Sequence, residues 1–182
     1  MIYQPAEDSY LLKDVVRDFL SEQNNKNMKI LDMGSGSGIQ ALACKDLGFE
    51  NVLAVDINME VVNYLKKKRL NTIESDLFSK IYEDNKFDLI IFNAPYLPED
   101  EREPEDIKLA TAAGKKGYEI IIRFLKEAKE FLNENGQILL LFSSLSQPKI
   151  ILNKANELGY NMRLLVSQMI PFEKLFVYEF KK

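Results

Sequence analysis

The sequence predicts an α/β protein built on one doubly wound sheet of seven strands, mostly parallel, with an antiparallel pair of strands at its C-terminal end. Segments with the helical spacing of apolar residues alternate along the chain with short apolar runs. The run at 138–142 is apolar at every position, which is typical of a strand covered on both faces. The last two extended segments, 162–169 and 174–180, are separated only by a short turn at Pro171. They must pair antiparallel, because a parallel crossover needs much more chain.

The remaining elements follow in a regular order. Leu12, Val16 and Leu20 share one face of an amphipathic helix over 7–22. We then expect a strand at 28–33, a helix at 39–47 that ends at Gly48, a strand at 51–55, a helix at 59–69, a short strand at 71–74 and a strand at 87–92. A helix over 117–133, closed by Gly136, precedes the strand at 138–142, and a helix over 147–158, ended by Gly159, precedes the final pair.

Length and charge narrow the classes of protein. The 182 residues fit a single domain, residues 1–182. A net charge of −4 argues against direct nucleic-acid binding, which needs clustered Lys and Arg, and the basic run at 66–69 is expected to be the solvated end of a helix. No apolar run approaches the roughly 20 residues of a membrane span, and the first residues do not resemble a signal peptide. We therefore expect a cytoplasmic protein that does not contact membranes.

The lack of histidine excludes several kinds of chemistry. The chain has no His and one Cys, Cys44, which lies among apolar residues of an expected helix and should be a core residue. Ser-His and Cys-His nucleophiles, a disulfide framework and His- or thiolate-ligated metals are excluded, and we expect no metal site. Catalysis must depend on positioning, on amide and carboxylate groups, or on a bound cofactor.

A glycine-rich loop follows the first strand. Gly34, Gly36 and Gly38 permit a tight turn and the close approach of a ligand to the backbone. With Ala41 the spacing also fits the dinucleotide fingerprint, so a NAD-dependent oxidoreductase stays open as an alternative. Asp32, at the end of the strand, places a negative charge beside the loop. This charge disfavours a pyrophosphate and favours a cationic or amine-bearing ligand.

Two further carboxylates stand at strand ends. Asp56 comes twenty residues after Gly36 and could accept both ribose hydroxyls of a nucleoside, whether from NAD or from S-adenosylmethionine. A role as a helix N-cap is less favoured, because Asn58 is available for capping. Asp76 could accept a hydrogen bond from the exocyclic amine of adenine, or it could cap a helix.

The step Asn93-Ala94-Pro95-Tyr96 follows the strand at 87–92, where ligands bind in open α/β sheets. The Asn93 side-chain oxygen and the Ala94 carbonyl can each accept one hydrogen of an NH2 group, and Pro95 restricts Ala94 to an extended conformation. Tyr96 can stack on a planar substrate or lie near a cation. Holding both hydrogens while aiming the nitrogen is catalysis by orientation.

Taken together, these motifs resemble the class I S-adenosylmethionine-dependent methyltransferases, which have a Rossmann-like fold, over nearly the whole chain. The opening run Tyr3-Gln4-Pro5-Ala6-Glu7-Asp8-Ser9-Tyr10-Leu11-Leu12 is more specific. It resembles the archaeal and eukaryotic branch of the HemK-type glutamine N5-methyltransferases, whose Asn-Pro-Pro-Tyr signature matches here at three of four positions. The resemblance implies methylation of the glutamine in the Gly-Gly-Gln motif of class 1 release factors, and some members also modify lysine. Ala94 stands where the family usually has Pro, and Asp32 where this branch often has Glu.

The resemblance also implies site residues and a partner. The substrate amide would be held by the catalytic step of Asn93, Ala94, Pro95 and Tyr96, with 112–117 on the substrate side. The cofactor S-adenosylmethionine would be bound by Ser9, Asp32, Gly34, Ser35, Gly36, Gly38, Asp56, Ile57, Asp76, Leu77 and Asn93. Eukaryotic enzymes of this branch work with a small zinc-binding activator, and the strand at 71–74, as a sheet edge, could receive such a partner by strand addition.

Other functions stay open at this point. The chain could methylate an exocyclic amine of a nucleic-acid base, although the acidic run at 99–106 would repel phosphates. It could instead be a non-catalytic cofactor-binding subunit or a NAD-binding Rossmann-type protein. The irregular stretch 97–116 is either a lid or a solvated insertion, and the sequence does not distinguish the two.

Overall fold

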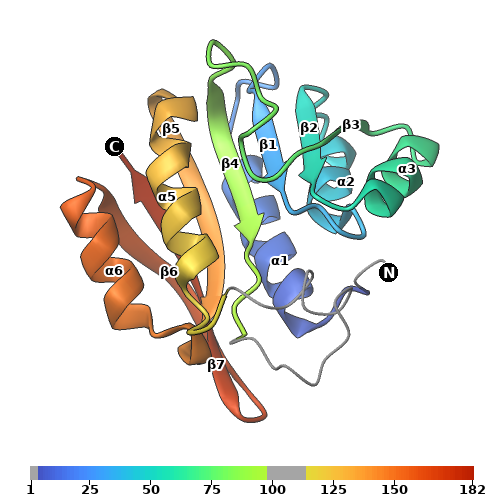
Figure 1. The fold of residues 1–182 in the computed structure, drawn as a ribbon. Coiled ribbons are helices and arrows are strands. Elements are labelled where there is room, and N and C mark those ends of the chain that lie inside the picture. The colour runs from blue at the N-terminus through green and yellow to red at the C-terminus, as the bar shows by residue number, and fades with distance from the viewer. Residues whose placement is uncertain (1–3, 98–113) are drawn as a thin grey trace.

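The computed structural model describes residues 4–97 and 114–182, and the expectations for Tyr3, for the acidic run at 99–106 and for residues 112–113 lie outside these ranges. The described helices and strands follow one another in the order that the sequence predicts (Figure 1). In chain order they are α1 (Glu7–Ser21), β1 (Ile30–Met33), α2 (Ile39–Asp46), β2 (Val52–Asp56), α3 (Met59–Lys67), β3 (Asn71–Glu74), β4 (Phe87–Asn93), α5 (Glu119–Phe131), β5 (Leu132–Ser143), the 3-10 turn η1 (Ser144–Ser146), α6 (Pro148–Glu157), β6 (Asn161–Ile170) and β7 (Glu173–Lys181).

The strands form one seven-stranded sheet in the order β3-β2-β1-β4-β5-β7-β6. Strands β1 to β5 are parallel, while β7 is antiparallel to both β5 and β6, which confirms the predicted fold class. From β1 the chain moves outward to β2 and β3 and then returns to β4 on the other side of β1. This reversal lies between β1 and β4, and ligands bind at such a reversal in open α/β sheets.

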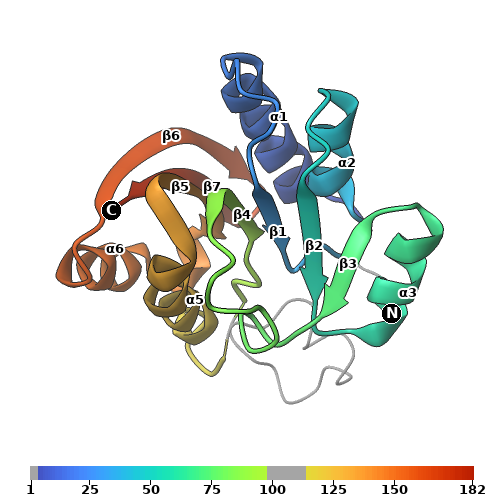
Figure 2. The same cartoon turned by 90° about the horizontal axis from the view of Figure 1, so that it is seen from above.

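Helices cover both faces of the sheet. Figure 2 shows α1 and α2 on one face and α5 and α6 on the other. Alternate residues of β4 point to opposite faces, so Leu89 and Ile91 pack in the cluster under α1 and α2, while Ile90 and Phe92 pack with Phe124 under α5. Because both faces are covered, the central strands are apolar throughout, as the sequence indicates. Cys44 is fully buried in the α1–α2 cluster, as predicted.

The boundary between α5 and β5 differs from the prediction. The helix begins at Glu119 and ends at Phe131, and the strand starts at once, so Gly136 lies inside β5 and does not close a helix. A Cβ at Gly136 would come within 2.7 Å of the Phe87 carbonyl oxygen. The pairing of β4 with β5 is irregular between Phe87 and Leu89, and Gly136 permits the close backbone contact there.

Smaller differences concern the ends of other elements. β1 begins at Ile30, two residues later than expected, and β6 and β7 are each slightly longer than predicted. Asn58 caps α3 by accepting a hydrogen bond from the Glu60 backbone N–H at 2.9 Å, as expected. Within 4–97 and 114–182, no helix is both long enough and apolar enough for a membrane crossing.

Candidate active site

The predicted site segments converge at the carboxyl ends of the parallel strands. Strands β1, β2, β3 and β4 are parallel, so their carboxyl ends lie together, and each is followed by one predicted segment (Figure 1). The glycine loop follows β1, Asp56 ends β2, residues 75–77 follow β3, and Asn93 ends β4. The structure thus gathers at one edge residues that are far apart in the sequence.

Asp56 and Ser35 hold the glycine loop against the end of β2. The Gly36 backbone N–H donates to Asp56 Oδ2 at 2.9 Å, and the Asn58 backbone N–H donates to Asp56 Oδ1, also at 2.9 Å. The Ser35 hydroxyl donates to the Asp32 carbonyl at 2.8 Å, and the Ser35 backbone N–H donates to the Val55 carbonyl at 2.9 Å. Ser35 is buried, and its hydrogen bonds fix the loop to the ends of β1 and β2.

Asp32 is a buried carboxylate under the loop. Only 1% of the residue is exposed, and its Oδ2 accepts a hydrogen bond from the Ala41 backbone N–H at 3.2 Å. Burial raises the pKa of Asp32 to about 7, while hydrogen bonds from Ala41 and Ser35 act in the opposite direction. Burial also raises the pKa of Asp56. A cation bound beside Asp32 would favour its ionised form, so this carboxylate is suited to a ligand that carries an amine.

The glycines of the loop serve different purposes. Gly34, Gly36 and Gly38 all have positive φ angles, which glycine adopts with little strain. A Cβ at Gly38 would lie 2.6 Å from Leu65 Cδ2, and one at Gly34 would lie 3.2 Å from Phe92 Cε2. At Gly38 the absent side chain therefore leaves room for Leu65 of α3, a reason that the sequence pattern alone does not reveal.

The segment after β3 carries an exposed carboxylate. Asp76 forms an ion pair with Arg123 of α5, and Arg123 also lies 3.5 Å from Glu127. Leu77 is buried with a φ angle of +46°, so it turns the chain at this point. Ile57, which follows Asp56, has 43% of its surface exposed at the same edge and offers an apolar surface there.

The side-chain amide of Asn93 reaches the first turn of α1. Its Nδ2 donates to Asp8 Oδ2 at 3.1 Å and to Ser9 Oγ at 3.4 Å, although these residues are more than 80 positions apart in the chain. Its Oδ1 is buried and has no hydrogen-bond partner among the described residues. An unpaired buried oxygen costs roughly 1–3 kcal/mol, so a donor from a bound substrate would find a favourable place here.

The rest of the step is held firmly. Ala94 is buried, and its backbone N–H donates to the Leu141 carbonyl at 3.4 Å. Tyr96 is half-buried and packs against both hydrophobic clusters. Pro95, between Ala94 and Tyr96 in the sequence, is also half-buried. The structure therefore keeps Asn93, Ala94 and Tyr96 at the reversal of the sheet.

Two residues of this region were not among the predicted site residues. Asp8 contacts Asn93, and Gln40 of α2 donates from Nε2 to the Ser9 carbonyl at 2.9 Å. Both side chains are buried, with 5% and 3% of each residue exposed. A polar side chain on the buried face of a helix is only a weak sequence signal for a buried hydrogen bond. The partners of Asp8 and Gln40 are distant in the chain, so the folded structure is needed to identify them.

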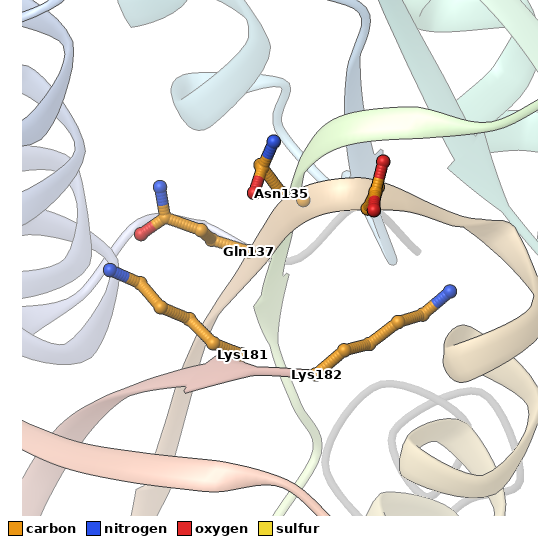
Figure 3. Close-up of a pocket in the computed structure, with 6 residues that line it drawn as sticks. Asn135, Gln137, Lys181 and Lys182 are labelled. Carbon is orange, nitrogen blue, oxygen red and sulfur yellow. The ribbon is translucent and has the colours of Figure 1, made fainter.

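A separate hollow lies at the opposite end of the sheet. Figure 3 shows side chains that line it, where the start of β5 meets the end of β7. It has a volume of about 250 Å³ and is lined by Glu134, Asn135, Gly136, Gln137, Lys181 and Lys182. None of the predicted site residues lies there. Among the residues that the structure describes, no group of three or more Asp, Glu or Cys is arranged to hold a metal ion.

The sheet order with an antiparallel β7, the glycine loop over Asp32 and the Asn-Ala-Pro-Tyr step at the end of β4 define the class: the protein is a class I methyltransferase. Residues 14–158 match the model of the methyltransferase small domain family, and the chain belongs to this family. An alternative reading of the glycine loop, as part of a NAD-dependent oxidoreductase, is not supported by this membership.

Several similar proteins with curated names are also named as methyltransferases. A protein N5-glutamine methyltransferase of Methanocaldococcus jannaschii is 38% identical, over 97% of this chain and 89% of the relative. Human methyltransferase HEMK2 is 29% identical, over all of this chain and 90% of the relative. A release factor glutamine methyltransferase of Rhodopirellula baltica is 32% identical over 71% of this chain, which spans only 49% of that longer protein.

Among solved structures, a chain of the E. cuniculi Mtq2–Trm112 complex superposes with a TM-score of 0.79 and 25% identity, covering all of this chain and 98% of that one. That complex is described as responsible for the methylation of the translation termination factor eRF1. The 16S rRNA guanine N2-methyltransferase of T. thermophilus, solved with AdoMet and guanosine, has a TM-score of 0.70 at 19% identity, a likeness that concerns the fold.

Proposed function

We propose that this chain is a cytoplasmic enzyme that methylates the side-chain nitrogen of the glutamine in the Gly-Gly-Gln motif of a class 1 release factor, with S-adenosylmethionine as the methyl donor. The observation that carries the proposal is the Asn93 side chain, whose buried Oδ1 has no partner among the described residues while its Nδ2 is bonded to α1. This arrangement offers an acceptor to an NH2 group. The relatives named for glutamine and release-factor methylation support the same substrate.

The donor set at the sheet edge fits S-adenosylmethionine. Asp56 would accept from the ribose hydroxyls, and the buried Asp32 would supply negative charge for the amino group of the methionine part. Ile57 would contact the adenine ring, and the Asp76 carboxylate would accept from the adenine amine while Arg123 stays beside it. Ser9, Leu77 and the loop residues Gly34, Ser35, Gly36 and Gly38 complete the proposed set.

The chemistry depends on orientation. When bound, S-adenosylmethionine supplies a methyl carbon on a positively charged sulfur, which leaves with its bonding electrons as the substrate nitrogen forms the new bond. An amide nitrogen is a weak nucleophile because its lone pair is delocalised. Asn93 Oδ1 and the Ala94 carbonyl would hold its two hydrogens and aim the nitrogen, and Tyr96 would pack against the plane of the amide. The backbone carbonyl at position 94 can serve with Ala in place of Pro.

The first experiment uses extract from cells that lack this gene. The purified chain is added with S-adenosylmethionine carrying a labelled methyl, and the product is digested separately with protease and with nuclease. We expect label that only protease removes, on a protein of release-factor size, and mass spectrometry should place the methyl on the glutamine of Gly-Gly-Gln. Label removed by nuclease would assign the chain to base methylation, and label on lysine would change the target residue.

Two controls make the result specific. Asn93→Ala removes the proposed acceptor and should lower kcat/KM on the order of 100-fold or more, as loss of an oriented hydrogen-bonding group does. A release factor with Ala in place of the target glutamine should accept no label. Calorimetric titration with S-adenosylmethionine and with NAD checks the cofactor separately from the substrate.

We also propose a small zinc-binding activator as partner, docked by strand addition on β3. In the sheet order, β3 (Asn71–Glu74) is an edge strand, and within 4–97 and 114–182 no strand pairs with its outer side, where a further strand could add. The Trm112 partner in the E. cuniculi complex supports the idea of a second subunit. A small protein that co-purifies from native lysate and raises the transfer rate of the purified chain is expected. A chain that is fully active alone, with nothing co-purifying, would contradict this part of the proposal.

A further inference from the structure

The first turn of α1 sets the orientation of the Asn93 amide. Asp8 Oδ2 lies 3.1 Å from Asn93 Nδ2, and Ser9 Oγ lies 3.4 Å from the same nitrogen. Asp8 and Ser9 are 5% and 3% exposed, so water has little access to this contact. An amide in such a place cannot rotate without exchanging buried hydrogen bonds.

The charge of the partner decides which end of the amide faces it. A carboxylate only accepts hydrogen bonds, so the NH2 end of Asn93 must point to Asp8. Turning the amide by 180° would place two acceptor oxygens against each other. With Nδ2 committed in this way, Oδ1 is the end left for a ligand, and it has no hydrogen-bond partner within the described ranges 4–97 and 114–182.

Asp8 is itself braced. Its Oδ1 accepts from the Ser9 backbone N–H at 2.6 Å and from the Ser9 hydroxyl at 3.2 Å. The Ser9 carbonyl accepts from Gln40 Nε2 at 2.9 Å, and Gln40 lies in the first turn of α2, just after the glycine loop. The carboxylate that orients Asn93 is therefore tied to the helix that follows the cofactor loop.

We propose that Asp8 is a positioning residue for the reaction: it locks the Asn93 amide so that the site presents only hydrogen-bond acceptors and admits only targets that carry an NH2 group. The proposal rests on the proposed function for its consequence in catalysis. The locked amide itself is a property of the free protein and can be tested without substrate.

The direct test is NMR of the Asn side-chain amides in the free protein, with the Asn93 signal assigned by its loss in Asn93→Ala. In the wild type this NH2 group should exchange slowly with solvent, because it is buried and bonded to a carboxylate. Asp8→Asn offers both a donor and an acceptor and removes the lock, so the Asn93 signal should shift and exchange faster. Asp14→Asn, an exposed residue of the same helix, is the matched control and should leave the signal unchanged.

The kinetic test uses the same variants with release factor and S-adenosylmethionine. Asp8→Asn should lower kcat/KM about 100-fold, mostly through kcat, because the defect is one of orientation, and the cofactor Kd should change far less than kcat does. In an Asn93→Ala background, Asp8→Asn should have almost no further effect, because the group that it orients is gone.

The outcomes separate the two proposals. Rapid exchange of the Asn93 amide in the wild type would overturn the lock even if the Asp8 variant failed to fold. An unchanged Asn93 signal in Asp8→Asn, or a full further loss of activity in the Asn93→Ala background, would also overturn it. A protected amide in a protein that modifies no release factor would support the lock and refute the proposed substrate.

Discussion

Gly38→Ala tests why the last glycine of the loop is required. The residue has a φ angle of +79°, and a side chain there is strained by about 1–2 kcal/mol. The new Cβ would lie 2.6 Å from Leu65 Cδ2 and 3.2 Å from Leu70 Cδ1. Both leucines are buried, so neither can swing into solvent, and overpacking of this kind costs about 1–3 kcal/mol. Gly38→Ala should therefore lower the free energy of unfolding by about 2–5 kcal/mol.

Gly48→Ala provides the matched control. Gly48 has a φ angle of +84°, but apart from Gly48 and its two chain neighbours no atom of the described residues lies within 4 Å of a Cβ placed there. This variant should lose only the backbone contribution, about 1–2 kcal/mol. Urea denaturation followed by circular dichroism gives both values under the same conditions.

The difference between the two variants measures the contact with Leu65. Equal losses for Gly38→Ala and Gly48→Ala would refute the packing argument. A stable Gly38→Ala protein that no longer bound S-adenosylmethionine would show instead that the cofactor, and not the packing of Leu65 and Leu70, requires glycine at this position. The experiment thus separates a structural from a ligand-binding reason for the same residue.

Four further predictions concern side chains of the candidate site and of the core. Asp32 has a folded-state pKa of about 7 against 3.8 in the unfolded chain, so the folded state binds a proton on this carboxyl more tightly than the unfolded state does. Protonated Asp32 therefore contributes to the free energy of unfolding. That contribution is full below pH 4 and is lost as the pH rises through 7. In urea titrations of the free protein, Asp32→Asn should remove this fall in the free energy of unfolding, which amounts to at most about 4 kcal/mol at pH 8. The same variant should weaken cofactor binding. Asp56→Ala should raise the Kd for S-adenosylmethionine roughly 10- to 100-fold in calorimetry, because hydrogen bonds to a charged group are lost. Tyr160→Phe removes the 2.7 Å bond to the Leu125 carbonyl and should lower the free energy of unfolding by about 1 kcal/mol without changing cofactor affinity. Burial raises the pKa of the Cys44 thiol, so a disulfide reagent should label it only after unfolding, and rapid labelling of the native protein would contradict its place in the core.

Local patterns were sufficient for the fold and for the meeting of several candidate site residues at one end of the strands. Apolar strands followed by Asp32, Asp56 and Asn93 predict residues that meet at the carboxyl edge of a parallel sheet, and the structure places them there. The short turn at Pro171 predicts the antiparallel pair because chain length alone excludes a crossover. These inferences depend on neighbours in sequence, which a single chain displays directly.

The features that the sequence did not predict depend on distant partners. Gly136 looks like a helix terminator, but its role comes from the Phe87 carbonyl, 49 positions away. Asp8 resembles an ordinary acidic residue in the first turn of a helix, where the dipole favours it, and its contact with Asn93 appears only in the folded chain. The spacing of Asp76 suggests a ligand or a cap, but its ion pair with Arg123, 47 positions away, appears only in the folded chain.

The position of β7 constrains the order in which the protein can fold. β7 lies between β5 and β6, although it follows both in sequence. During synthesis β6 therefore leaves the ribosome without its neighbour in the sheet, and β5 keeps an unpaired edge until residues 173–181 have emerged. β7 can pair first with either neighbour, but the sheet is complete only when β7 is paired with both β5 and β6. Until then the nascent chain carries an exposed apolar strand, which makes this interval the one in which chaperone binding or aggregation would compete with folding.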